Sequence, residues 1–296
     1  MEGVVVKPLL LSRVRRAVLA LAALAGSVAA AGPAAAWDDL AHRVVADLAY
    51  TRLAPATKAQ VDILLAQAAV VAEPSCPVAS IADAAVYPDC VDGIRRFNEM
   101  RRWHEQAEPF CPAEAKGDPC KDGQCVREAV KRALAVLGDS TAAPAMRVAA
   151  LEQAVHFIAD LHDPLDMIDN RDDFGRDLRV VLPGSSDKRL NFHDFWNAHM
   201  PAVAVGSEEI GVRYVAPLVA QGQAWSEGGP DTWASETTAL ARNLYAHLPE
   251  PPPCGRTPRK PEALDRTYVL AQAPVAREQL AKAAVRLAAA LNAALR

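Results

Sequence analysis

The chain has 296 residues, of which 51% are hydrophobic and 23% are charged, and its formal net charge is −4. This composition is typical of a globular protein with a substantial buried core, and it excludes the strongly basic surface of a protein that binds nucleic acid tightly without sequence preference. Nucleic acid remains possible as a substrate, because bound metal ions can supply positive charge locally.

Residues 1–36 have the layout of a secretory signal peptide. Basic residues within the first 16 positions precede the apolar run AVLALAALAGSVAAA, and the small residues Ala34, Ala35 and Ala36 follow. We therefore expect cleavage before Trp37, a periplasmic or secreted location, and no stable membrane association of the processed chain. An uncleaved membrane anchor is the alternative interpretation.

Apolar residues at spacings of three and four predict a mainly α-helical domain over residues 37–296. A short β excursion is expected at LRVVL, residues 178–182, and the proline-rich PEPPPC, residues 249–254, is expected to be a loop. The sequence shows no internal repeat and no linker that demands a second domain. The predicted helical segments are residues 38–53, 55–70, 126–138, 145–162, 191–200 and 273–295.

The chain contains an even number of cysteines, which in an exported protein predicts up to three disulfide bonds. The sequence does not choose among the possible pairings. A zinc knuckle in CPAEAKGDPCKDGQC, which contains three of the cysteines, is the alternative, although its spacing fits poorly and export argues against it. The cysteines are Cys76, Cys90, Cys111, Cys120, Cys125 and Cys254.

Histidines and acidic residues recur at helical spacing. His156 and Asp160 lie four residues apart in AVHFIADLHDPLD, so they share one helix face, and His193 and Asn197 repeat this spacing. Imidazole nitrogen and carboxylate oxygen are the usual ligands of zinc when cysteine is engaged elsewhere. Together these residues favour metal ligation over ordinary surface or core histidines.

The ordered motifs resemble the zinc-dependent single-strand nuclease and 3′-nucleotidase family, which shares a helical fold with bacterial zinc phospholipase C. Trp37 is followed five residues later by His42, and the chain continues with Tyr-Pro-Asp at 87–89, Trp-His at 103–104, HFIADLHDPLD, FGRD and NFHDFWN. The family pattern has these segments in the same order. The resemblance spans essentially the whole chain from residue 37.

The resemblance implies two neighbouring zinc sites. One ion would be held by Asp89, His104, His156 and Asp160, and the other by His42, Asp160 and the backbone amine and carbonyl of Trp37. Asp160 would bridge the ions, which would hold a hydroxide between them for attack on phosphorus. Asp89 and Asp160 are the expected catalytic carboxylates, with Asp83 and Asp92 as alternatives to Asp89.

A third, doubtful site departs from the family pattern. The family's two histidines and one aspartate correspond here to Asp166, His193 and Asn197. The motif G-G-N is Gly175-Arg176-Asp177, and a basic position expected to contact phosphate is Asp92. Arg176 is therefore the candidate substrate-binding residue, with Arg95 and Arg96 as further candidates.

The function implied by the resemblance is hydrolysis of phosphodiester bonds in single-stranded DNA or RNA, or of 3′-nucleotides. We expect the chain to be a monomer. Two alternatives stay open. One is a degenerate relative that binds metal with weak or no nuclease activity, and the other is a phospholipase C-like activity.

Overall fold

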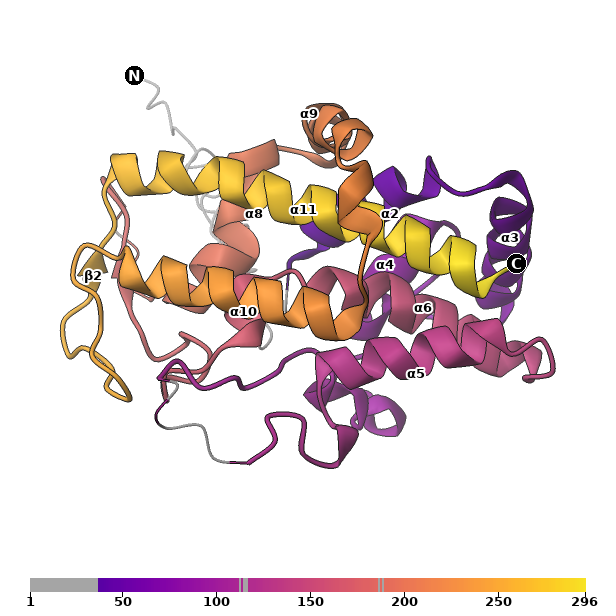
Figure 1. Cartoon of the computed structure of the whole chain (residues 1–296), viewed down its shortest axis with the longest axis horizontal. Helices are drawn as coiled ribbons and strands as arrows, with labels where there is room; N and C mark the ends of the chain where they lie inside the picture. The colour runs from indigo at the N-terminus through magenta and orange to yellow at the C-terminus, as the bar shows by residue number, and fades with distance from the viewer. Residues whose placement is uncertain (1–36, 112, 114–116, 186, 188) are drawn as a thin grey trace, which may run out of the picture. The chain divides into compact units, whose positions relative to one another are not determined.

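The computed structural model describes residues 37–111, 113, 117–185, 187 and 189–296, and the predicted signal peptide lies outside these residues. In this part of the chain the structure is mainly α-helical, with one two-stranded sheet (Figure 1). The predicted fold class is therefore confirmed. No helix among the described residues is both long and apolar enough to cross a membrane.

The predicted helices form close to their expected bounds. The Asp38 carboxylate caps the first helix by accepting a hydrogen bond from the backbone amide of Ala41, at 3.1 Å. Pro55 and Pro144 each occupy the first position of a later helix, where proline is favoured. These helices are α2 (Asp39–Tyr50), α3 (Pro55–Val71), α5 (Val126–Gly138) and α6 (Pro144–Asp160).

Other helices occupy stretches for which the sequence made no specific prediction. They are α4 (Ile81–Cys90), α9 (Glu208–Gln221) and α10 (Pro230–Ala246). Helix α4 includes Pro88 near its end, a residue that normally discourages a helix assignment. Short 3₁₀ turns connect the helices: η1 (Arg95–Phe97), η2 (Met100–Arg102), η4 (Lys121–Gly123), η5 (Pro164–Met167) and η7 (Gln223–Ser226).

The predicted β excursion is present but short. Strand β1 (Val180–Val181) pairs in parallel with β2 (Glu262–Ala263). The segment predicted as one helix over 191–200 consists of α7 (Phe192–Asp194), a π-helical turn η6 (Phe195–His199) and the start of α8 (Met200–Val205). Such π turns occur often at functional sites, and this one carries Asn197.

The core forms around the terminal helix α11 (Arg266–Ala294), which begins earlier than predicted and continues through Pro274. This helix packs against α2, α6, α8 and α9, and in Figure 1 it runs the length of the domain. Large side chains fill the interior, and these include Phe157, Phe192, Phe195, Trp196 and Tyr245, all of them fully buried.

All six cysteines form disulfides, so the zinc-knuckle alternative is wrong. The pairs are Cys76–Cys90, Cys111–Cys254 and Cys120–Cys125. The first bond ties the segment before α4 to the last residue of that helix, directly after Asp89. It therefore restrains the end of the helix that carries a candidate ligand.

One buried carboxylate, Glu152 in α6, forms no ion pair with any described residue that would offset its burial. Its side chain is 6% exposed, and burial raises its pKa from 4.5 to about 7. The folded protein thus binds this proton more tightly than the unfolded chain. The stability associated with this proton is fully present below pH 4.5 and is lost as the pH rises through about 7.

We predict that Glu152→Gln stabilises the protein above pH 7, because glutamine cannot ionise. The gain over the parent should approach roughly 3 kcal/mol at pH 8.5 and shrink toward zero near pH 4.5. Urea unfolding of both proteins at several pH values measures this difference. The exposed Glu209→Gln serves as the control, and a Glu152→Gln effect that does not change with pH would contradict the prediction.

Candidate metal centre

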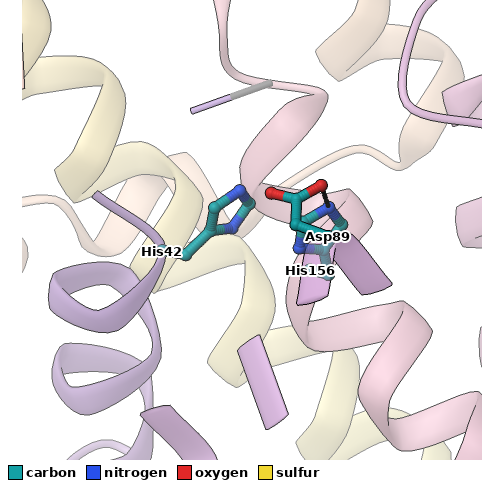
Figure 2. A group of neighbouring side chains, drawn as sticks. All are labelled: His42, Asp89 and His156. Atoms are coloured by element: carbon teal, nitrogen blue, oxygen red, sulfur yellow. Dashed lines mark ion pairs between the residues drawn. The ribbon is translucent and has the colours of Figure 1, made fainter. Parts of the chain in front are cut away.

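Separate segments bring their polar side chains to one point in the interior. His42 comes from α2, Asp89 from the end of α4, His104 from the segment after η2, and His156 and Asp160 from α6. Figure 2 shows His42, Asp89 and His156 converging. His42, His156 and Asp160 are fully buried, whereas Asp89 is partly exposed and lines a cavity of about 350 Å³.

The Asp160 carboxylate lies at the centre of this group. Its Oδ1 is 3.2 Å from Nε2 of His42, while its Oδ2 is 3.1 Å from Nδ1 of His104 and 3.1 Å from Nε2 of His156. Each oxygen therefore faces different histidines. A carboxylate in this orientation can bind two metal ions at once, one through each oxygen.

Backbone contacts fix the orientation of His156. Its Nδ1 donates a hydrogen bond to the carbonyl oxygen of Ala85 in α4, at 2.6 Å, which leaves the Nε2 lone pair facing Asp160. That nitrogen is 3.0 Å from Nδ1 of His104 and 3.6 Å from Oδ1 of Asp89. Two imidazole nitrogens and two carboxylates thus crowd around a small volume, as they do around a bound cation.

The electrostatics favour a carboxylate that stays ionised. Burial by itself would raise the pKa of Asp160, but the three histidines outweigh it and hold that pKa well below its usual range. Burial likewise disfavours a charged His42, yet the adjacent carboxylate of Asp160 raises the pKa of that imidazole. The centre therefore carries a fixed negative charge on Asp160, and cations are attracted to it.

The residues fit a metal ion by a further criterion. Both ring nitrogens of His42, Oδ1 of Asp160 and Oδ1 of Asp89 are buried without a hydrogen-bond partner among the described residues. Buried polar atoms without partners are rare because each one costs free energy. Convergent lone pairs of this kind are what a divalent ion requires.

The structure also distinguishes among the three aspartates considered near Tyr-Pro-Asp. Asp83 forms an ion pair with Arg43 at 3.0 Å, and Asp92 forms one with Arg101 at 3.0 Å. Asp89 instead lies 3.6 Å from both His104 and His156. Of the three, Asp89 is the carboxylate placed beside the histidines.

A second acidic group lies beside the first and consists of Glu105, Asp166 and His193, whose candidate ligand atoms are all within 4.8 Å of one another. The sequence analysis missed Glu105, although it directly follows His104. The backbone amide of Gln106 donates to the backbone carbonyl of Asp166 at 2.7 Å, and this hydrogen bond holds the two segments side by side. The position of Glu105 thus depends on a long-range backbone contact that sequence spacing does not reveal.

The other residues assigned to the third site occupy the same region. Asn197 lies one turn after His193, and its Nδ2 is 3.4 Å from Nε2 of that histidine. The backbone carbonyl of Asn197 accepts a hydrogen bond from the backbone amide of Asp38 at 3.0 Å. This bond holds the adjacent, buried Trp37 near the helix that carries Asn197. Arg176 forms an ion pair with Glu105, and its Nη2 lies 2.9 Å from Nε2 of His193.

His162 takes no part in either group. Its Nδ1 donates to the carbonyl of Ile158 at 2.7 Å, and its Nε2 accepts a hydrogen bond from Nη1 of Arg286 at 3.0 Å. Burial, with a smaller effect of the Arg286 charge, lowers the pKa of His162 to about 3. This histidine is a neutral part of the core, not a candidate ligand.

These features define a helical protein with a buried histidine and carboxylate centre of the kind that binds divalent ions for hydrolysis. The family model for the S1/P1 nuclease matches residues 37–296. The chain therefore belongs to the S1/P1 nuclease family, as the ordered motifs indicated, and membership supports a nuclease or phosphoesterase function. A comparison with curated proteins finds no match.

We predict that Asp160→Asn lowers the metal content of the protein at both neighbouring positions, because the amide carries no charge and presents only one oxygen. Elemental analysis of zinc-loaded protein after gel filtration measures the loss. Asp163→Asn is the matched control, since Asp163 is also buried in the same segment but caps the amide of Leu165 at 2.8 Å. Equal metal content in the two variants would refute the assignment of Asp160.

Proposed function

We propose that the chain is an exported, zinc-dependent phosphoesterase that hydrolyses phosphodiester bonds of single-stranded DNA or RNA, and the ester of 3′-nucleotides. The observation that carries this proposal is the Asp160 carboxylate, whose two oxygens face different histidines. Membership of the S1/P1 nuclease family supports the reaction class.

The donor set favours zinc over magnesium or calcium, because imidazoles outnumber carboxylates around Asp160 and hard cations prefer oxygen ligands. One ion would be held by Asp89, His104, His156 and Asp160. The other would be held by His42, Asp160 and the backbone of Trp37. When bound, zinc supplies an activated water at neutral pH and stabilises negative charge on the phosphate.

Asp89 is suited to orient the attacking water and to take up its proton. It is the carboxylate of the centre with partial exposure, and its Oδ1 has no hydrogen-bond partner among the described residues. The cavity beside it is also lined by Arg43, Tyr87 and the carboxylates of Asp39 and Asp83, so solvent can reach the Asp89 side chain there. Asp160, fully buried, would serve to hold the ions.

One observation supports export, because three disulfides are typical of an oxidising compartment. We propose that residues 1–36 are the signal peptide, that residues 37–296 form the catalytic domain, and that this domain acts as a monomer.

The second candidate is a degenerate relative that retains metal but hydrolyses nucleic acid weakly. The observation in its favour is the altered third group, where Asn197 and Arg176 surround His193. A phospholipase C-like activity is the alternative within enzymes. Substrate assays decide between these functions.

We predict that the processed protein carries zinc and cleaves single-stranded DNA, RNA or 3′-AMP, with little turnover of phosphatidylcholine. His104→Ala should reduce hydrolysis by at least about 100-fold, because it removes a ligand of one ion. The exposed His247→Ala should retain full activity and serves as the matched control. Zinc-loaded protein that hydrolyses none of the nucleotide substrates would refute the proposal and favour the degenerate relative.

We predict that signal cleavage creates part of the site. A terminal amine at Trp37 can bind a metal ion once it is deprotonated, and α-amines titrate near about 7.7–8.0. A protein with one extra alanine before Trp37 should therefore contain one zinc ion fewer than the processed chain. Elemental analysis measures this difference, and an unchanged zinc content in the extended protein would exclude the Trp37 amine as a ligand.

A further inference from the structure

We infer that this chain binds two metal ions and not three, because the guanidinium of Arg176 occupies the third position and supplies a fixed positive charge there. The inference rests on the proposed function for the first two ions. It concerns the group formed by Glu105, Asp166 and His193, which resembles a metal site in composition but already contains a cation.

The Arg176 guanidinium uses lone pairs of Glu105 and His193, whereas both carboxylate oxygens of Asp166 are buried without a hydrogen-bond partner among the described residues. Nδ1 of His193 donates to the carbonyl of Phe174 at 3.1 Å, so its Nε2 is the nitrogen that carries the lone pair. Nη2 of Arg176 lies 2.9 Å from this nitrogen and donates to it, and the same Nη2 is bonded to Oε1 of Glu105. One guanidinium nitrogen therefore engages two of the three candidate ligands.

The remaining residue expected at this site does not restore a metal-binding set. Asn197 directs its amide Nδ2 toward Nε2 of His193, at 3.4 Å. A metal ion would instead need the side-chain amide oxygen of Asn197, which is neutral and a weaker ligand than the aspartate of the family pattern. Asp166 is thus the only one of the three residues assigned from the family pattern that presents a carboxylate, and a third ion would have to displace Arg176 from both Glu105 and His193.

The backbone places Arg176 in this position by specific contacts. Gly175 has a φ of +85°, and a Cβ at that position would come within 3.1 Å of both Leu165 Cδ1 and the Tyr245 hydroxyl. The Gly175 carbonyl accepts hydrogen bonds from the amides of Phe192 and His193, at 3.2 and 3.4 Å. The turn that carries Arg176 is therefore joined directly to the start of the helix that carries His193.

The Arg176 side chain is 23% exposed, so the guanidinium can also meet a ligand from solvent. Guanidinium groups bind phosphate oxygens through paired N–H donors and stay charged at all relevant pH values. We therefore assign Arg176 to the phosphate of the substrate, where it provides the positive charge that a third ion would otherwise provide.

The test is a metal count on intact, zinc-saturated protein from an exporting host. Arg176→Ala should bind about one zinc more per chain than the parent, because Glu105, Asp166 and His193 then form an open three-ligand site. Arg176→Lys should match the parent, as should the control Arg179→Ala, which removes an exposed arginine from the same segment. Asp166→His combined with Asn197→Asp should gain no zinc while Arg176 is present.

The inference is overturned if Arg176→Ala gains no zinc, if Arg176→Lys gains as much as Arg176→Ala, or if the double variant gains zinc with Arg176 in place. Should Arg176→Ala fail to fold, anomalous diffraction from zinc-soaked crystals of the parent gives the answer. We expect no zinc peak among Glu105, Asp166 and His193, and a peak there would overturn the inference. Zinc missing beside Asp160 would instead contradict the proposed function, so the two failures are distinguishable.

Discussion

The structure depends on one carboxylate, that of Asp160, held without solvent contact among three imidazoles. Burying an ionised carboxylate is costly unless compensating charge and hydrogen bonds surround it. Here the compensation comes from His42 on α2, His104 after η2, and His156 on the same helix. The packing of α2 and α4 against α6 is therefore tied to the chemistry of the centre, because each of these helices contributes a candidate ligand.

Support for the ligands comes from outside the centre. The carbonyl of Ala85 sets the His156 ring, and the disulfide Cys76–Cys90 holds the end of α4 where Asp89 is located. Contacts of this kind fix the direction of a ligand's lone pair, and their loss typically lowers metal affinity or activity by about 10–100-fold. Pro88 in the same helix removes one intrahelical hydrogen bond, the one that a residue with an N–H at this position would donate to the carbonyl of Ala84.

Sequence reasoning succeeded where a local rule was sufficient. The i, i+4 spacing of His156 and Asp160 placed both on one face of α6, and the order of motifs identified the family. Sequence reasoning was insufficient where a contact between residues distant in the chain decides the geometry. Glu105 lies beside Asp166 because the backbone amide of Gln106 donates to the backbone carbonyl of Asp166, and the cysteine pairs follow from the packed fold. Neither contact has a signature in residue spacing.

The two groups show why ligand composition alone does not identify a metal site. Imidazole nitrogens and carboxylate oxygens are acceptors, so the same atoms serve a zinc ion or a guanidinium equally well. What differs is the side chain that reaches them. Among the described residues, the Asp160 carboxylate contacts three histidines and no arginine, whereas the guanidinium of Arg176 contacts Glu105 and His193. A cluster of acceptors therefore indicates a cation, and the presence or absence of a nearby arginine decides whether the protein or the solvent provides it.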